Sequence, residues 1–148
     1  MSTYTQILYQ IVFSTKNREA CLSKDRREEL YSYIWGIVKN KKCHLYRIGG
    51  VEDHIHIVTH LHQSIALADL VKDIKTASSN MIKTEQMFKN FPGWQIGYGA
   101  FTYSIGAKTN LINYVKSQEE HHKTNNYTTE LQRLLKEHQI DYDDKYLL

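Results

Sequence analysis

The chain has 148 residues, with 19 Lys and Arg against 16 Asp and Glu, a formal net charge of +3 and 11 tyrosines. This length is enough for one domain with its own hydrophobic core, and the two cysteines form no close pair that would indicate a disulfide framework or a thiolate zinc site. No apolar run approaches membrane-spanning length and no signal-peptide pattern opens the sequence. We therefore expect a cytoplasmic protein without a membrane partner, forming a single domain over residues 1–148 with a tail helix and an acidic end from about residue 124.

The charge is unevenly distributed along the chain. Residues 1–110 contain 14 Lys and Arg against 9 Asp and Glu, whereas residues 111–148 contain 5 against 7. A modestly basic body with many aromatic residues suits a polyanion such as single-stranded nucleic acid, because phosphates bind cations and bases stack on rings. Surface charge and core aromatics account for the same composition, so this feature alone does not identify a partner.

The first half of the chain predicts a helix between strands. Residues 4–13 are rich in β-branched and aromatic side chains and predict a first strand. Residues 25–39 carry apolar side chains at helical spacing and predict a helix. Residues 43–48 then predict a second strand, which a glycine pair closes, and residues 54–61 predict a third.

The second half predicts further helices around one strand. Residues 67–87 have an apolar face at helical spacing, and Pro92, the only proline, interrupts the chain. A fourth strand is expected within residues 96–104, followed by a helix that starts near Thr109. A short tail helix around residues 131–135 precedes the acidic end.

The order β-α-β-β-α-β followed by further helices indicates a ferredoxin-like fold of the α+β class. In this fold an antiparallel sheet has helices packed on one face. Many unrelated proteins use it, including RNA-recognition modules, so the function has to be inferred from a site.

Two histidine pairs have a spacing that suits metal binding on a strand. His54 and His56 would project from the same face, about 6.6 Å apart along the backbone. His60 and His62 repeat the pattern shortly afterwards. Neutral imidazoles bind divalent cations, but both pairs cannot be central to one site, and periodicity does not choose between them.

Tyr114 and Gln118 lie four residues apart in the helix predicted from Thr109. Their side chains would share a face, about 6 Å apart along the axis. An amide oxygen can join two imidazoles around a divalent cation, and a phenol beside that cation is a candidate nucleophile. A reference pKa of about 10 makes a phenol a poor nucleophile at neutral pH, so a cation that polarises a phosphate oxygen would be needed. No residue identifies itself as the general base.

Six segments, in chain order, resemble the single-tyrosine HUH transposases of the insertion-sequence 200/605 family, REP-associated relatives included. The segment around His54 and His56 resembles the His-hydrophobic-His motif of that family, and the segment from Tyr114 resembles its tyrosine helix. Gln10 departs from the pattern, because many relatives have histidine there. The six segments are residues 12–18, 49–58, 75–79, 94–95 with 98–101, 114–122 and 140–146.

The resemblance implies a transposase that cuts and rejoins single-stranded DNA ends, often folded as hairpins, through a covalent 5′-phosphotyrosine. It implies His54, His56 and Gln118 as metal ligands, Tyr114 as the nucleophile on a C-terminal catalytic helix, and Mg²⁺ or Mn²⁺ as the cofactor. The second histidine pair then becomes solvent-facing or hydrogen-bonded at a strand end. Family members work as homodimers in which the tyrosine helix of one subunit completes the metal site of the other in trans.

Residues outside the metal site are expected to contact DNA phosphates, and each neutralised phosphate adds salt-dependent affinity. Helical angles place His121 near the Tyr114 edge, where it would be a phosphate contact or an auxiliary ligand. The DNA-binding candidates are Lys16, Arg18, Arg47, Lys75, Ser78, Ser79 and His121.

Two other classes of function fit parts of the sequence. A ferredoxin-like single-stranded nucleic-acid-binding module would use aromatic residues of its sheet and would need neither a metal nor Tyr114. A histidine-based zinc hydrolase would use His54, His56 and His60 around zinc, with water as the nucleophile.

Overall fold

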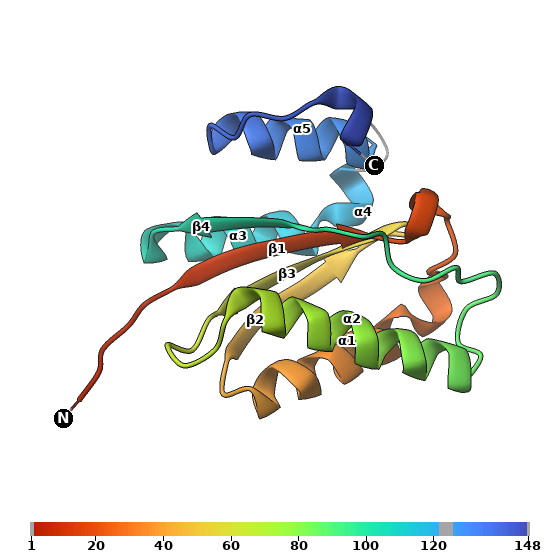
Figure 1. The fold of residues 1–148 in the computed structure, drawn as a ribbon, viewed down its shortest axis with the longest axis horizontal. Helices are drawn as coiled ribbons and strands as arrows, with labels where there is room; N and C mark the ends of the chain where they lie inside the picture. Colours follow the sequence, from red (N-terminus) through yellow and green to blue (C-terminus); the bar gives the residue numbers. More distant parts are fainter. Residues whose placement is uncertain (1, 122–125, 148) are drawn as a thin grey trace.

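The structure, a computed structural model, describes residues 2–121 and 126–147, with the backbone alone at residue 121. Four strands form one antiparallel sheet in the order β2-β3-β1-β4 (Figure 1). The two central strands contain no Asp, Glu, Lys or Arg, as expected for strands covered on both faces. The strands are β1 (Leu8–Ser14), β2 (His44–Gly50), β3 (His54–His60) and β4 (Gly99–Tyr103).

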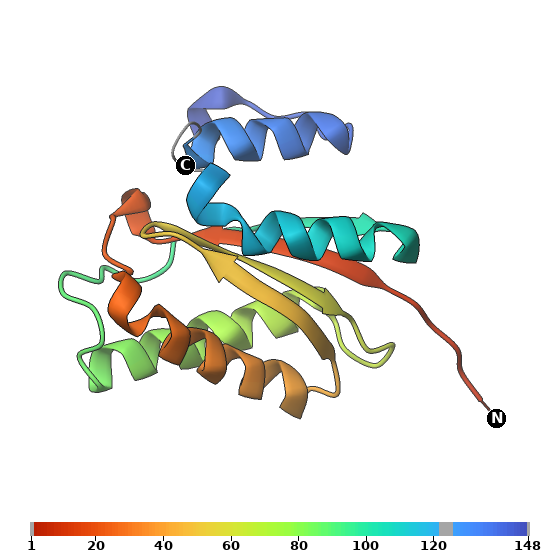
Figure 2. The same cartoon turned by 180° about the vertical axis from the view of Figure 1, so that it is seen from behind.

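Two helices, α1 (Lys24–Asn40) and α2 (Leu67–Thr84), cover one face of this sheet (Figure 2). Successive side chains of a strand point to opposite faces, so Phe13 of β1 and Ile57 of β3 enter the core beneath these helices. Both helices bury apolar residues at helical spacing, as the sequence predicted, and each also buries one polar side chain, Arg27 in α1 and Ser78 in α2. The ferredoxin-like α+β architecture is therefore confirmed.

The opposite face of the sheet is covered by C-terminal elements, namely α3 (Lys108–Lys116), α4 (Gln118–His121) and α5 (Tyr127–Glu137). α3 packs on β1 and β3, and α5 packs on β1 and β4. Within residues 2–121 and 126–147, none of the helices is long and apolar enough to span a membrane. The apolar contacts on this face come from Leu8, Val12, Val58, Phe101, Leu111, Val115, Tyr127, Leu131, Leu134 and Leu135.

The helix predicted to start near Thr109 and to include Gln118 is broken in the structure. α3 ends at Lys116, Ser117 leaves the helical region with φ −95° and ψ 18°, and Gln118 begins α4. The Ser117 hydroxyl donates a hydrogen bond to the carbonyl oxygen of Asn113 at 2.8 Å. The two side chains expected on one helical face therefore lie on two short helices with a turn between them.

The first strand is shorter than predicted. It begins at Leu8 rather than Tyr4, because Leu8 pairs with His60 and Tyr103, the last residues of β3 and β4. The paired residues of the register end at Leu8. One backbone hydrogen bond lies beyond it, from the Leu61 nitrogen to the carbonyl oxygen of Ile7 at 2.9 Å, and the Tyr4 side chain is exposed.

A glycine pair at the end of β2 allows α3 to approach the sheet closely. A Cβ atom added at Gly49 would lie closer than 3.0 Å to the carbonyl oxygen of Val115, and one at Gly50 would crowd the carbonyl oxygen of His54. Only glycine fits such a contact without displacement. Because Tyr114 precedes Val115 on α3, this close approach also sets the position of Tyr114 over the sheet.

Candidate metal centre and nucleophile

His54 and His56 project from β3 toward the C-terminal helices. Both are fully buried, and their ring centroids lie 5.1 Å apart. His54 Nδ1 lies 2.7 Å from a carboxylate oxygen of Asp53, and His56 Nδ1 lies 2.7 Å from Oε1 of Gln10. Both partners are acceptors, so each Nδ1 donates its hydrogen to them and each Nε2 is turned toward the C-terminal helices. Hydrogen bonds of this kind orient histidines that bind metals.

Gln10, where the sequence departs from many relatives, therefore has a defined place in the site. Its amide nitrogen donates to the hydroxyl of Tyr103 at 2.7 Å, which turns its carbonyl oxygen toward His56. Gln10 is fully buried in the middle of β1, and its strand partner is Val58 of β3. The residue acts on His56 through the ring nitrogen that does not face the site.

Two oxygen donors approach the Nε2 atoms of this pair. Gln118 of α4 is buried, and its Oε1 lies 3.4 Å from His54 Nε2. Glu130 of α5 is also buried; its Oε1 contacts His56 Nε2 and lies 3.9 Å from His54 Nε2. Ligand atoms of His54, His56 and Glu130 all lie within 4.8 Å of one another. Two imidazoles, a carboxylate and an amide oxygen form a donor set that fits a divalent cation.

Tyr114 reaches this donor set from α3 in the same chain. Its ring centroid lies 5.8 Å from that of His56, at an interplanar angle of 88°. Its hydroxyl accepts a hydrogen bond from Nη2 of Arg133 at 2.9 Å. Burial, with the Glu130 carboxylate nearby, raises the pKa of Tyr114 above its usual value, while Arg133 and Gln118 act in the opposite direction. The phenol is therefore protonated at neutral pH.

The sequence reasoning missed the contribution of α5. Besides Glu130 and Arg133, this helix supplies Tyr127, whose ring centroid lies 4.6 Å from the ring centroid of His54. Burial raises the pKa of Tyr127, as it does for Tyr114. One signal was present in the sequence: Glu130 falls on the same helical face as Leu134, so a carboxylate stands on the apolar side of an amphipathic helix. A buried carboxylate requires a partner.

The second histidine pair lies outside the site and makes local hydrogen bonds, as the resemblance implied. Nδ1 of His60 accepts from the backbone nitrogen of Ile7 at 3.2 Å. Nδ1 of His62 lies 2.7 Å from the Ser64 hydroxyl and accepts from the Ser64 backbone nitrogen.

Two of the predicted DNA-binding side chains, Ser78 and Lys75, make contacts within the fold. The Ser78 hydroxyl is buried, donates to the carbonyl oxygen of Ile74 at 2.6 Å and accepts from Nε1 of Trp94 at 3.0 Å. Lys75 Nζ donates to the carbonyl oxygens of Gln95 and Gly97. These two side chains hydrogen-bond α2 to the segment of residues 94–97.

The other DNA-binding candidates are at least partly accessible. Lys16 and Arg47 are exposed, and Arg18 and Ser79 are half-buried. The side chain of His121 lies outside the described residues.

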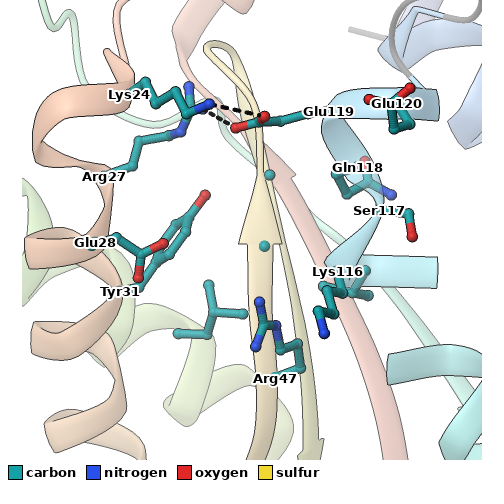
Figure 3. A pocket seen from close by; sticks show the side chains of 14 residues that line it. Lys24, Arg27, Glu28, Tyr31, Arg47, Lys116, Ser117, Gln118, Glu119 and Glu120 are labelled. Atoms are coloured by element: carbon teal, nitrogen blue, oxygen red, sulfur yellow. Dashed lines mark hydrogen bonds and ion pairs between the residues drawn. The ribbon is translucent and has the colours of Figure 1, made fainter. Parts of the chain in front are cut away.

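A pocket of about 440 Å³ adjoins the candidate metal centre and shares Gln118 with it (Figure 3). It lies between α1, the end of β2 and the turn from α3 to α4. Four cations line it, and two of them, Lys24 and Arg27, are ion-paired with Glu119 at 3.3 and 3.0 Å. The other two cations are Arg47 and Lys116.

Comparisons with known proteins give the chain a family and a shared fold. The sequence model of a family described as IS200-like transposases matches residues 3–118. A candidate transposase from Deinococcus radiodurans R1 is 18% identical with a TM-score of 0.62, over 80% of this chain and 95% of that one. A REP-associated tyrosine transposase bound to a REP hairpin is 13% identical with a TM-score of 0.62, over 82% of this chain and 74% of that one. At these identities the two structures show a shared fold. No curated protein matches the sequence.

Proposed function

Because the chain belongs to the IS200-like transposase family and is a DNA transposase, we propose that it cuts and rejoins single-stranded DNA through Tyr114 beside a divalent cation. The observation that carries this proposal is the convergence, within one chain, of the Tyr114 ring on the buried His54 and His56 pair. Sequence spacing predicted each half of the proposed site, and the short distance between the rings of Tyr114 and His56 supports joining them in one site.

We propose His54, His56 and Gln118 as metal ligands, as predicted, and add Glu130 as a fourth. The donor set supports Mg²⁺ or Mn²⁺, since oxygen donors suit both ions and imidazole nitrogens favour Mn²⁺. When bound, the cation would polarise a phosphate oxygen and stabilise the charge that develops on it. Glu130 adds a negative charge to an otherwise neutral set, which strengthens the attraction for a cation.

In the reaction that we propose, the Tyr114 oxygen attacks a phosphodiester. The bond from this oxygen to phosphorus forms and the bond from phosphorus to the 3′ oxygen breaks. The phenol loses one proton and the departing 3′ oxygen gains one, which gives a 3′ hydroxyl. The downstream strand stays attached as a 5′-phosphotyrosine. Because one ester replaces another, attack by a 3′ hydroxyl reverses the step and rejoins DNA without ATP.

The proposed substrate is single-stranded DNA with ends folded as hairpins. The REP-associated relative of the same fold is bound to a hairpin, and Arg47 and Lys116 of the pocket beside Gln118 would bind phosphates. Lys16, Arg18 and Arg47 remain proposed contacts, as do Ser79 and His121. Lys75 and Ser78 would affect DNA binding indirectly, by positioning residues 94–97.

A homodimer with the tyrosine helix acting in trans is the expectation from the family resemblance. The contacts of Tyr114 with residues of its own chain support a cis arrangement instead, because the proposed nucleophile and ligands meet without a second copy. A dimer therefore remains a prediction about assembly and is not needed to complete the site.

Covalent capture tests the proposed reaction. The protein is incubated with hairpin oligonucleotides taken from inverted repeats beside the gene, with Mg²⁺ or Mn²⁺, and run on a denaturing gel. A 3′-label should move with the protein, whereas a 5′-label should leave on a fragment with a free 3′ hydroxyl. Tyr114→Phe and chelation of the metal should each abolish the adduct, and Tyr33→Phe, at an exposed position of α1, should leave it unchanged.

The two other functions give different results in this experiment. A nucleic-acid-binding module would bind the oligonucleotide and give no adduct under any condition. A zinc hydrolase would turn over a small molecule and be insensitive to Tyr114→Phe; the hydrogen bond from Ile7 to Nδ1 of His60 also leaves that residue poorly suited to join His54 and His56.

A further inference from the structure

Arg133 of α5 donates a hydrogen bond to the hydroxyl of Tyr114. Its Nη2 donates to this oxygen at 2.9 Å, and its guanidinium carbon lies 5.2 Å from the centroid of the Tyr114 ring. Its other terminal nitrogen, Nη1, donates to Glu137 at 2.7 Å. The guanidinium is thus held on one side by its own helix and presents its other side to the proposed nucleophile.

The position of α5 brings two of its side chains to the proposed site. Arg133 and Glu130 are three residues apart and so lie on the same side of the helix, about 4.5 Å apart along its axis. Glu130 contacts His56, and Arg133 contacts Tyr114. Tyr127, Leu131, Leu134 and Leu135 hold the helix against the sheet. One turn of α5 therefore reaches both halves of the site.

We propose that Arg133 is a catalytic residue of the DNA-cutting step, where its guanidinium holds the attacking oxygen and then binds the phosphate joined to it. This inference rests on the proposed function of Tyr114. It goes beyond the family assignment, because the family match ends at residue 118 and α5 lies entirely after it.

The chemistry of the step gives this guanidinium a role at each stage. Before attack it donates to the phenol oxygen and fixes the direction of the ring. As the bond to phosphorus forms and the bond to the 3′ oxygen breaks, negative charge spreads over the phosphate and the two bridging oxygens. Arginine stays protonated throughout, and its planar donors match phosphate oxygens. Its side chain is 45% exposed, so a phosphate can approach from solvent on this side of Tyr114.

Single-turnover kinetics of adduct formation tests the proposal on the full chain. Arg133→Ala and Arg133→Lys are compared with wild type, using a saturating amount of protein, Mn²⁺ and a 3′-labelled hairpin oligonucleotide. Loss of one preorganised donor to a developing charge predicts an adduct rate about 100-fold lower for Arg133→Ala. Arg133→Lys should recover part of this rate, because it restores the charge without the planar fork. Lys136→Ala, at an exposed cation of the same helix, should react like wild type.

Two further measurements separate catalysis from folding and binding. The oligonucleotide Kd, by fluorescence anisotropy, and the Mn²⁺ affinity, by calorimetry, should be unchanged in Arg133→Ala. An Arg133→Ala variant that reacts as fast as wild type at saturation overturns the proposal, even if its Kd is weaker, because Arg133 would then serve binding alone. A wild-type protein that forms no adduct overturns the proposed function and this inference with it.

Discussion

At the scale of single residues, hydrogen bonds to the Nδ1 atoms orient the two buried imidazoles. Asp53 and Gln10 each accept a hydrogen bond from an Nδ1, which leaves both Nε2 atoms directed toward Gln118 and Glu130. Gln10 lies on β1, whereas Asp53 lies in the turn directly before β3, so the orientation of His56 depends on the register between β1 and β3.

Gln10→Ala should weaken metal binding without removing a ligand. The substitution leaves the buried Nδ1 hydrogen of His56 without its acceptor, which should cost about 1–3 kcal/mol of unfolding free energy. Loss of such an outer hydrogen bond should lower the affinity for Mn²⁺ by about 10- to 100-fold. Calorimetric titration and thermal unfolding measure the two effects. Gln10→Glu retains an acceptor and is the matched control; equal losses in both variants would contradict the argument.

Glu130→Gln tests the fourth proposed ligand. The amide keeps the shape of the side chain but removes its charge, so Mn²⁺ affinity should fall by at least about tenfold, since ligand charge tunes such sites. Glu137→Gln, which removes a carboxylate from the exposed face of the same helix, should leave the affinity unchanged. An unaltered titration of Glu130→Gln would show that this carboxylate is no ligand.

At the scale of elements, the contact between α3 and the end of β2 places the proposed nucleophile. Gly49 faces the carbonyl oxygen of Val115, and Tyr114 directly precedes Val115 on α3. The helix also stops at Lys116, which lets Gln118 turn toward His54 from α4. Helical spacing predicted that Tyr114 and Gln118 would lie close together, and the contact arises by a different route, through a turn at Ser117.

Gly49→Ala should displace α3 and slow DNA cutting. The added methyl would meet backbone, which cannot move aside cheaply, so overpacking should cost about 1–3 kcal/mol. A shift of about 1 Å in the reacting oxygen can reduce a rate by about 100-fold. Gly36→Ala is the control, because no atom lies within 4 Å of its added Cβ on α1; it should stabilise the protein by about 0.5–1 kcal/mol. Chemical denaturation and adduct rates compare the two variants.

At the scale of the whole molecule, the sheet separates two layers with different roles. α1 and α2 close the apolar core on one face, while α3, α4 and α5 enclose the histidine pair on the other (Figures 1 and 2). All the proposed groups converge within one chain, so a single copy contains the proposed nucleophile and the proposed ligands.

Mixing two inactive variants distinguishes a cis site from a trans site. Tyr114→Phe keeps the proposed ligands and lacks the proposed nucleophile, whereas His56→Ala keeps the proposed nucleophile and lacks one proposed ligand. If the site works as the single chain arranges it, the mixture should give no adduct at any protein concentration. Recovery of adduct to a substantial fraction of the wild-type level would require an intact site shared between two copies and would establish the trans dimer. Sedimentation of the wild type measures the assembly itself.

The sequence by itself determined the order of elements, the family and the fact that His54 and His56 share one face of their strand, because side-chain alternation and helical spacing are local properties of the backbone. Only the tertiary structure decided that Glu130 and Arg133 of the tail helix join them. The place of Glu130 on the apolar face of a helix predicts that its side chain is buried. It does not predict which residue that side chain contacts. That partner is fixed by how α5 packs across β1 and β4, since contacts between distant segments depend on the whole core.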